Sequence, residues 1–250
     1  MAENSKIEWT HHTFNPWIGC TKVSAACDNC YAEAWDARFK GDRWGPKADR
    51  TRTKTWGNPI KWNRKAKAEG TRYRVFCASL ADVFDNHKSI LPEWRKELWA
   101  LIKATPHLDW LLLTKRPQNI ERYLPNDWGK GYPNVWLGIT AENQLEYDRR
   151  WGHLFQIPCV IRFLSCEPFL GGIDIHGEDE IDWVIVGGEN HKEPRHMKLD
   201  WLRNLRDQCA TTDTAFLFKQ WSGNGQKEIK AMGRELDGII HDGYPTTKTF

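Results

Sequence analysis

Three cysteines near the start of the chain form the residue pattern best suited to chemistry. Cys20, Cys27 and Cys30 fall within eleven residues, and the next cysteine is Cys77. Three thiolates this close together, without a fourth, suit a metal site that lacks one protein ligand. An iron–sulfur cluster held in this way keeps one iron open, whereas a structural site would be closed.

The same residues also permit a zinc site. Cys27 and Cys30 have the spacing of half a zinc knuckle, Cys20 would be the third ligand, and His11 or His12 the fourth. Against zinc, no second pair of ligands follows at its own close spacing. The chain has seven cysteines and starts without a signal peptide, so we expect a cytoplasmic protein with metal or redox chemistry instead of disulfides.

Basic and aromatic residues alternate between Lys40 and Arg72. Eleven lysines and arginines lie there against three acidic residues, although the net charge of the whole chain is only +3. Basic groups that meet phosphates and aromatic rings that stack on bases are typical of nucleic-acid surfaces. The residues predicted to contact DNA or RNA are Arg43, Trp44, Arg50, Arg52, Lys54 and Trp56. The alternative is a solvated, loop-rich insertion whose tryptophans anchor it to the body of the protein.

Short apolar runs alternate with amphipathic segments from residue 73 onward. Strands are predicted at Arg74–Leu80, Asp109–Thr114, Asn134–Thr140, Val160–Ser165, Asp182–Gly187 and Thr214–Lys219, with one more near Ile7–Phe14. Helices are predicted to begin at Pro92, to run over Asn143–Phe155 and to run over Asp200–Cys209, with Asp200 as an N-cap. No apolar run is long enough to span a membrane.

This alternation predicts an α/β fold with parallel strands and helices packed outside them. Six or seven strands favour a partial or complete (β/α) barrel. A doubly wound dinucleotide fold is less favoured because no glycine-rich turn follows the first strand. We expect one barrel domain over residues 1–222, with the basic insertion at about 38–72, and a C-terminal extension over 223–250.

Polar residues follow several of the predicted strands at their carboxyl ends. In α/β barrels these ends surround the active site, so they are the predicted site here. The clusters are Thr114-Lys115-Arg116, Thr140-Ala141-Glu142-Asn143, Ser165-Cys166-Glu167-Pro168, Gly187-Gly188-Glu189-Asn190 and Lys219-Gln220-Trp221.

The cysteine trio at the start of such a fold resembles the radical S-adenosylmethionine (radical SAM) enzymes. More specifically, the chain resembles the phage-associated three-cysteine-motif family. The motifs that carry this resemblance are Ile7–Thr10, Asn15–Ser24, Cys27–Glu33, Leu113–Pro117, Asn134–Gly138, Glu142–Gln144, Ser165–Pro168, Asp182–Glu189 and Phe218–Trp221. Six residues separate the first two cysteines instead of the usual three, and Asn29 stands where an aromatic residue is frequent. The three-cysteine-motif family shares the long gap.

The resemblance implies a 4Fe–4S cluster on Cys20, Cys27 and Cys30, with S-adenosylmethionine cleaved to a 5′-deoxyadenosyl radical. It implies an electron donor such as flavodoxin or ferredoxin. With the basic stretch, it predicts a DNA or RNA substrate for lesion repair or base modification. The residues assigned to the cosubstrate are Tyr31, Thr114, Lys115, Arg116, Thr140, Glu142, Asn143, Ser165, Glu167, Gly187, Gly188 and Glu189.

Two further residues are assigned to catalysis. Cys77 shares the parity of Ser79 and is the better interior candidate, whereas Cys166 is expected to face the helices. Lys219 is the second catalytic candidate. Two other functions stay open: a non-catalytic nucleic-acid-binding module with a structural zinc, and a radical SAM enzyme that acts on a small molecule or a peptide.

Overall fold

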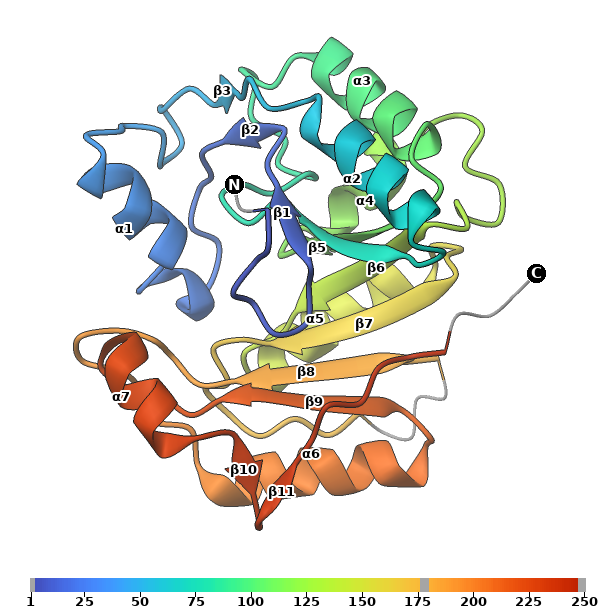
Figure 1. Cartoon of the computed structure of the whole chain (residues 1–250). Coiled ribbons are helices and arrows are strands. Elements are labelled where there is room, and N and C mark those ends of the chain that lie inside the picture. The colour runs from blue at the N-terminus through green and yellow to red at the C-terminus, as the bar shows by residue number, and fades with distance from the viewer. Residues whose placement is uncertain (1–2, 176–179, 247–250) are drawn as a thin grey trace. The chain divides into compact units, whose positions relative to one another are not determined.

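The computed structural model describes residues 3–175 and 180–246, and it is an α/β fold (Figure 1). The strands are β1 (His12–Phe14), β2 (Trp17–Ile18), β3 (Thr51–Arg52), β4 (Tyr73–Cys77), β5 (Leu108–Thr114), β6 (Val135–Thr140), β7 (Ile161–Cys166), β8 (Trp183–Gly187), β9 (Ala215–Gln220), β10 (Glu235–Leu236) and β11 (Ile239–Ile240). The α-helices are α1 (Tyr31–Arg38), α2 (Asn58–Ala68), α3 (Pro92–Lys103), α4 (Ile120–Tyr123), α5 (Gln144–Phe155), α6 (Leu199–Thr211) and α7 (Gly225–Met232).

Seven strands form the main sheet, in the order β1-β4-β5-β6-β7-β8-β9. The pairs β1–β4, β4–β5, β7–β8 and β8–β9 are parallel. Helices follow β4, β6 and β8 along the chain. The α/β class and the predicted number of parallel strands are therefore confirmed. No helix of the described residues is long and apolar enough to cross a membrane.

The chain divides into two compact units. The first contains Met1–Val23, Ala32–Leu137 and Ile157–Val160. The second contains Ser24–Tyr31, Gly138–Gln156 and Ile161–Phe250. The chain crosses from one to the other within β6, between Leu137 and Gly138.

The core of the first unit is built from large aromatic and aliphatic side chains. Trp9, Phe14, Trp17, Phe84 and Trp110 are almost completely buried. β5 reads as a near-continuous apolar run, as expected of a parallel strand with both faces covered. Helix α2 packs against β4 and β5.

Helix α2 lies within the basic stretch and is anchored to the first unit by a tryptophan. Trp62 is buried, and its ring stacks on His12 with the ring centroids 4.3 Å apart. For this residue the anchoring interpretation of the insertion is confirmed. The predicted extension groups with the second unit and contains α7, β10 and β11. Its last four residues, 247–250, lie outside the described residues.

His12 gives the fold a sensitivity to acid. Its side chain is 3% exposed, and burial lowers its pKa to about 4, with smaller contributions from His11 and Lys65. Because the unfolded chain binds this proton near pH 6.5 and the folded chain only near pH 4, stability should fall as the pH drops between these values. We expect His12→Phe, which retains a ring against Trp62, to reduce that loss by about 1–3 kcal/mol.

The measurement is urea denaturation at pH 7 and pH 5, with the difference in unfolding free energy compared between variants. His196 is exposed, so His196→Phe is the control and should follow the wild type. If His12→Phe loses as much stability as the wild type, burial of a neutral His12 is not the source of the acid sensitivity.

The second unit is built around β7, β8 and β9. Phe163, Phe169, Trp183 and Phe218 are fully buried there. Figure 1 shows β8 and β9 side by side with α6 running along β9, and α6 contacts β9. The predicted N-cap of α6 is wrong: the helix begins at Leu199, which places Asp200 in its first turn. An acidic residue there still favours the helix because it faces the positive end of the helix dipole.

Candidate functional site

The three cysteines are free thiols that lie in different parts of the chain's fold. Cys20 is half-buried in the first unit. Cys27 is buried and Cys30 half-buried in the second. None of the three forms a disulfide. Within the residues that the structure describes, no group of three or more His, Cys, Asp or Glu side chains is placed to hold a metal ion. The three-thiolate site therefore stays a prediction, and each unit is described by its own geometry.

An arginine lies against the first cysteine. Arg116 Nη1 donates to Cys20 Sγ at 3.5 Å, and Arg116 Nη2 donates to the carbonyl oxygen of Thr21 at 2.7 Å. Burial raises the pKa of the Cys20 thiol to about 11, and the guanidinium opposes that rise because it stabilises the thiolate. Arg116 is thus a neighbour of a predicted metal ligand, in addition to its predicted role at the cosubstrate.

Two buried aspartates hold Arg116 in place. Asp82 Oδ2 lies 3.2 Å from Arg116 Nη1, and Asp85 Oδ1 lies 3.7 Å from Arg116 Nε. Asp82 also accepts a hydrogen bond of 2.8 Å from the hydroxyl of Thr114, another predicted site residue. Burial alone would lower the pKa of Arg116, but the two aspartates and Cys20 raise it above its usual value. The guanidinium therefore stays charged beside Cys20.

Arg50 occupies the centre of the basic segment and has no exposed side-chain surface. Its guanidinium donates to Asp85 at 2.9 Å and to Thr21 Oγ1 at 2.7 Å. Three carbonyl oxygens accept further hydrogen bonds from it, those of Arg43, Gly45 and Ala48. An arginine whose three guanidinium nitrogens all donate to protein groups in this way is a structural element. This burial argues against the predicted contact of Arg50 with nucleic acid, which stays a prediction.

Close packing at Gly19 completes the surroundings of Cys20. Gly19 has a φ of +117°, and a Cβ atom there would lie 2.5 Å from the carbonyl oxygen of Arg43. Only glycine combines this backbone conformation with so close an approach. The amide of Gly45 donates to the carbonyl oxygen of Cys20 at 2.9 Å. The basic segment is therefore packed directly against the first cysteine.

In the second unit, an acidic residue at the end of β6 holds the segment that carries the other two cysteines. Glu142 Oε1 accepts a hydrogen bond of 2.9 Å from the amide of Ala26, at a short 3₁₀ helix, Ala25–Cys27. Its Oε2 lies 3.0 Å from Arg150 Nη1. Burial would raise the pKa of Glu142, but its contacts with Ser24, Ala26 and Arg150 hold it below its usual value. Glu142 is thus a charged anchor for the residues around Cys27.

Glu189, after β8, makes the equivalent connection next to Cys30. Its Oε2 accepts a hydrogen bond of 3.0 Å from the side-chain amide of Asn29. Arg195 Nε also donates to Glu189 Oε2 at 3.0 Å, and Arg195 Nη1 lies 3.2 Å from Asp28 Oδ2. Against the effect of burial, Arg195 and Asn29 keep the pKa of Glu189 below its usual value. Glu142 and Glu189 therefore both bind the cysteine segment of their own unit.

A third pair joins the ends of β7 and β9. Lys219 Nζ lies 2.6 Å from Glu167 Oε1, and both side chains are partly exposed. The hydroxyl of Ser165 lies 3.3 Å from Glu167 Oε2. A Cβ atom on Gly187 would lie 2.8 Å from Glu167 Oε1, so the absence of a side chain there makes room for this pair. Gly188 is likewise packed against Ser222. The structure brings Ser165, Glu167, Gly187 and Lys219 together.

The remaining residues assigned to the cosubstrate or to catalysis have varied surroundings. Tyr31 is exposed, Lys115 is half-buried, and Thr140 is buried. Asn143 is the N-cap of α5, where its side chain accepts from the amide of Glu146. Cys77 is fully buried, and that burial raises the pKa of its thiol.

Burial raises the pKa of the Cys166 thiol, with a smaller contribution from Cys209 of α6, and the expectation that Cys166 faces a helix stays a prediction.

The other residues predicted to contact DNA or RNA differ in their exposure and in their ion pairs. Arg43 pairs with the buried Asp36. Arg52 pairs with Glu97 and lies 4.3 Å from the ring centroid of Trp56. Lys54 is exposed, and Trp44 is half-buried. The exposed positive charge of this segment is therefore smaller than its composition predicts.

Four charged residues of these networks were missed at the sequence level: Asp82, Asp85, Arg150 and Arg195. The two aspartates follow β4 at its carboxyl end, so the strand-end argument would have found them had it been applied to that strand. Arg150 stands four residues after Glu146 on the buried face of α5, and this i,i+4 spacing was an available signal. No sequence pattern links Arg195 to Glu189.

Comparison with known proteins shows membership of one family. The model of the family described as "Protein of unknown function (DUF5131)" matches residues 4–245. No curated protein matches the chain. No solved structure matches it.

Proposed function

Because the chain belongs to the DUF5131 family, whose function is unknown, we propose its activity from its own residues: it is a radical SAM enzyme that acts on nucleic acid. In this proposal Cys20, Cys27 and Cys30 ligate a 4Fe–4S cluster, and the seven-strand sheet is a partial barrel. The reaction would be lesion repair or base modification, with flavodoxin or ferredoxin as the electron donor.

The observation that carries the proposal is the attachment of the cysteine segment to strand ends. Glu142 follows β6 and binds the amide of Ala26, next to Cys27. Glu189 follows β8 and binds Asn29, next to Cys30. Carboxyl ends of parallel strands are where α/β enzymes place their active sites, so two of the three thiols belong to the catalytic edge of the sheet. A zinc module that only stabilised a loop would not need this location.

The types of residue present suit an iron–sulfur cluster. The three thiols are free, and thiolates are the ligands that such clusters prefer. Arg116 supplies positive charge 3.5 Å from Cys20 Sγ, which favours the deprotonated form that a metal requires. When bound, such a cluster supplies the electron that cleaves S-adenosylmethionine.

The chain's own residues then have separate tasks. Glu142 and Glu189 orient the segment that carries Cys27 and Cys30, and Asp82 and Asp85 orient Arg116 beside Cys20. Lys219 Nζ donates to Glu167 Oε1 at 2.6 Å, and we assign the partly exposed Lys219 to proton transfer at the substrate. The buried apolar side chains of β7 and β8 exclude water from the base of the site.

Metal analysis and product analysis of the wild-type protein test the proposal. After anaerobic purification we expect about four irons and four sulfides per chain. The reduced protein incubated with S-adenosylmethionine should release 5′-deoxyadenosine. A colourless protein with one zinc and no iron would reject the radical enzyme and favour the structural-zinc alternative. A loaded cluster without cleavage of the cosubstrate would also reject it.

A further inference from the structure

The first unit contains a cleft of about 370 Å³ whose lining includes Thr21, the residue after Cys20. Asp85 and Arg116 line it, and both are buried. Val23 and Pro46 contribute apolar walls, and Asn86 and Lys88 are exposed at its edge. The volume falls within the range of small-ligand sites.

The floor of the cleft carries no net charge. Arg116 pairs with Asp82 and Asp85, and Arg50 also pairs with Asp85, so two positive groups are balanced by two negative ones. These side chains form hydrogen bonds and ion pairs with one another, and the two arginines also donate hydrogen bonds to Thr21. These buried residues therefore neither repel a charged ligand strongly nor offer it an unpaired ion. The charged part of a ligand must be bound by other residues of the cleft.

One wall is held in place by a chain of hydrogen bonds. Nε2 of His87 lies 3.2 Å from the carbonyl oxygen of Pro46, so this nitrogen must carry the proton. Nδ1 of His87 then accepts from the hydroxyl of Ser89 at 2.7 Å, and the same hydroxyl oxygen accepts from the amide of Arg50 at 2.8 Å. The loop after β4 and the segment around Pro46 are thus tied together, which gives the cleft a fixed width.

The edge of the cleft supplies the free donors. Lys88 and Asn86 are exposed, and neither side chain has a hydrogen bond or ion pair with another described residue. An ammonium and an amide at one edge suit a phosphate, and two apolar walls suit a planar ring or a sugar. A molecule with both parts is a nucleotide.

We propose that this cleft binds one nucleotide of the nucleic-acid substrate, in a single strand or turned out of a duplex. The phosphate contacts Lys88 and Asn86, and the sugar and base lie against Val23 and Pro46. Arg116 contacts Cys20 and lines the cleft, so a nucleotide bound there is next to the first cysteine. The inference rests on the proposed function for its substrate class, but it concerns binding and needs no cluster.

The test uses fluorescently labelled fifteen-nucleotide dT and U strands and the full chain. We expect Lys88→Ala to weaken binding about fivefold and to reduce the slope of log affinity against log salt by about 0.7, the value for one phosphate contact on a single strand. Val23→Ser should weaken binding about threefold with an unchanged slope, because it removes apolar contact but no charge.

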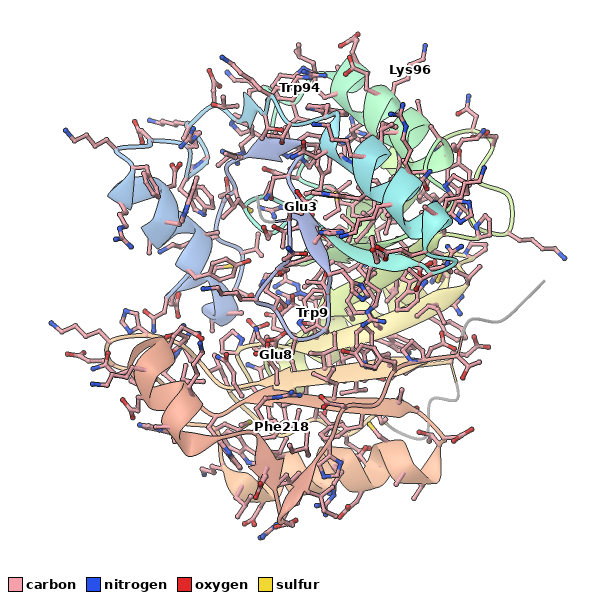
Figure 2. The ribbon with its side chains drawn as sticks, viewed as in Figure 1. Glu3, Glu8, Trp9, Trp94, Lys96 and Phe218 are labelled. Atoms are coloured by element: carbon pink, nitrogen blue, oxygen red, sulfur yellow. The ribbon has the colours of Figure 1, made fainter. Side chains whose placement is uncertain are left out.

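Lys96 provides the matched control. It is exposed and points outward from α3 in Figure 2, so Lys96→Ala should change neither the affinity nor the slope. If the wild type binds neither strand, or if Lys88→Ala and Val23→Ser bind as the wild type does, the nucleotide cleft is wrong. The same holds if Lys96→Ala is as damaging as Lys88→Ala.

A separate readout distinguishes this inference from the proposed function. Iron content and cleavage of S-adenosylmethionine without nucleic acid are measured in the wild type, separately from strand binding. Absence of iron and of cleavage in the wild type would reject the radical enzyme. Weakened binding by Lys88→Ala would still support the cleft in that case.

Discussion

Replacement of Cys27 by alanine is expected to abolish iron binding and cleavage of the cosubstrate. The proposed cluster depends on three thiolates, and this substitution removes one of them. Bound iron should fall from about four per chain to close to none. Release of 5′-deoxyadenosine should fall below detection. Iron analysis and chromatography of the products measure the two effects.

Cys159 supplies a control of equal burial. Cys27 and Cys159 are each 9% exposed, so the cost of truncating a buried thiol should be similar at both positions. Cys159→Ala should therefore retain its iron and its activity. Loss of iron in both variants would mean that Cys27 acts through stability. Full iron in Cys27→Ala would remove this residue from the ligand set and, with it, the three-thiolate cluster.

Replacement of Arg50 by alanine is expected to lower the free energy of unfolding by about 3–5 kcal/mol. The substitution leaves the Asp85 carboxylate buried with less compensation, and removing one partner of a buried ion pair costs this much. It also leaves three backbone carbonyl oxygens without their donor. Urea denaturation at pH 7 measures the loss.

Arg52 stands two residues away and is the matched control. Its side chain is 37% exposed, and it pairs with the half-exposed side chain of Glu97 at the surface. Because exposed ion pairs contribute little, Arg52→Ala should cost about 0–1 kcal/mol. Similar losses in the two variants would show that Arg50 is not the structural centre of the segment. Lower nucleic-acid affinity in a stably folded Arg50→Ala protein would restore the original prediction for this residue.

Much of the fold could be read from local patterns. Each of the six apolar runs predicted as strands between residues 74 and 219 overlaps a strand, because a parallel strand buried on both faces leaves a short, nearly continuous apolar run. The helix that begins at Pro92 was equally legible, since proline suits a first helical turn. Helix α2 was not predicted, because its charged residues concealed the buried face formed by Pro59, Trp62 and Ala66.

Part of the candidate site could be predicted from the sequence. Placing chemistry at strand ends correctly selected Glu142, Glu167, Glu189, Arg116 and Lys219 as members of polar clusters. Their partners could not be read, because Glu142 meets Ala26 over 116 residues of sequence and Arg116 meets Cys20 over 96. Such contacts depend on which loops pack together, and the type of a charged residue does not identify its partner in a distant part of the sequence.

Arg50 and Lys88 illustrate the difference between what sequence patterns predict and what the folded structure shows. Periodicity and residue type were enough to predict the α/β class and the positions of the strands. That Arg50 is buried in an ion-pair network while Lys88 is exposed at a cleft became visible in the folded chain alone. This difference follows from desolvation, because a guanidinium leaves water only where a carboxylate and several carbonyl oxygens converge on it, and folding creates that convergence.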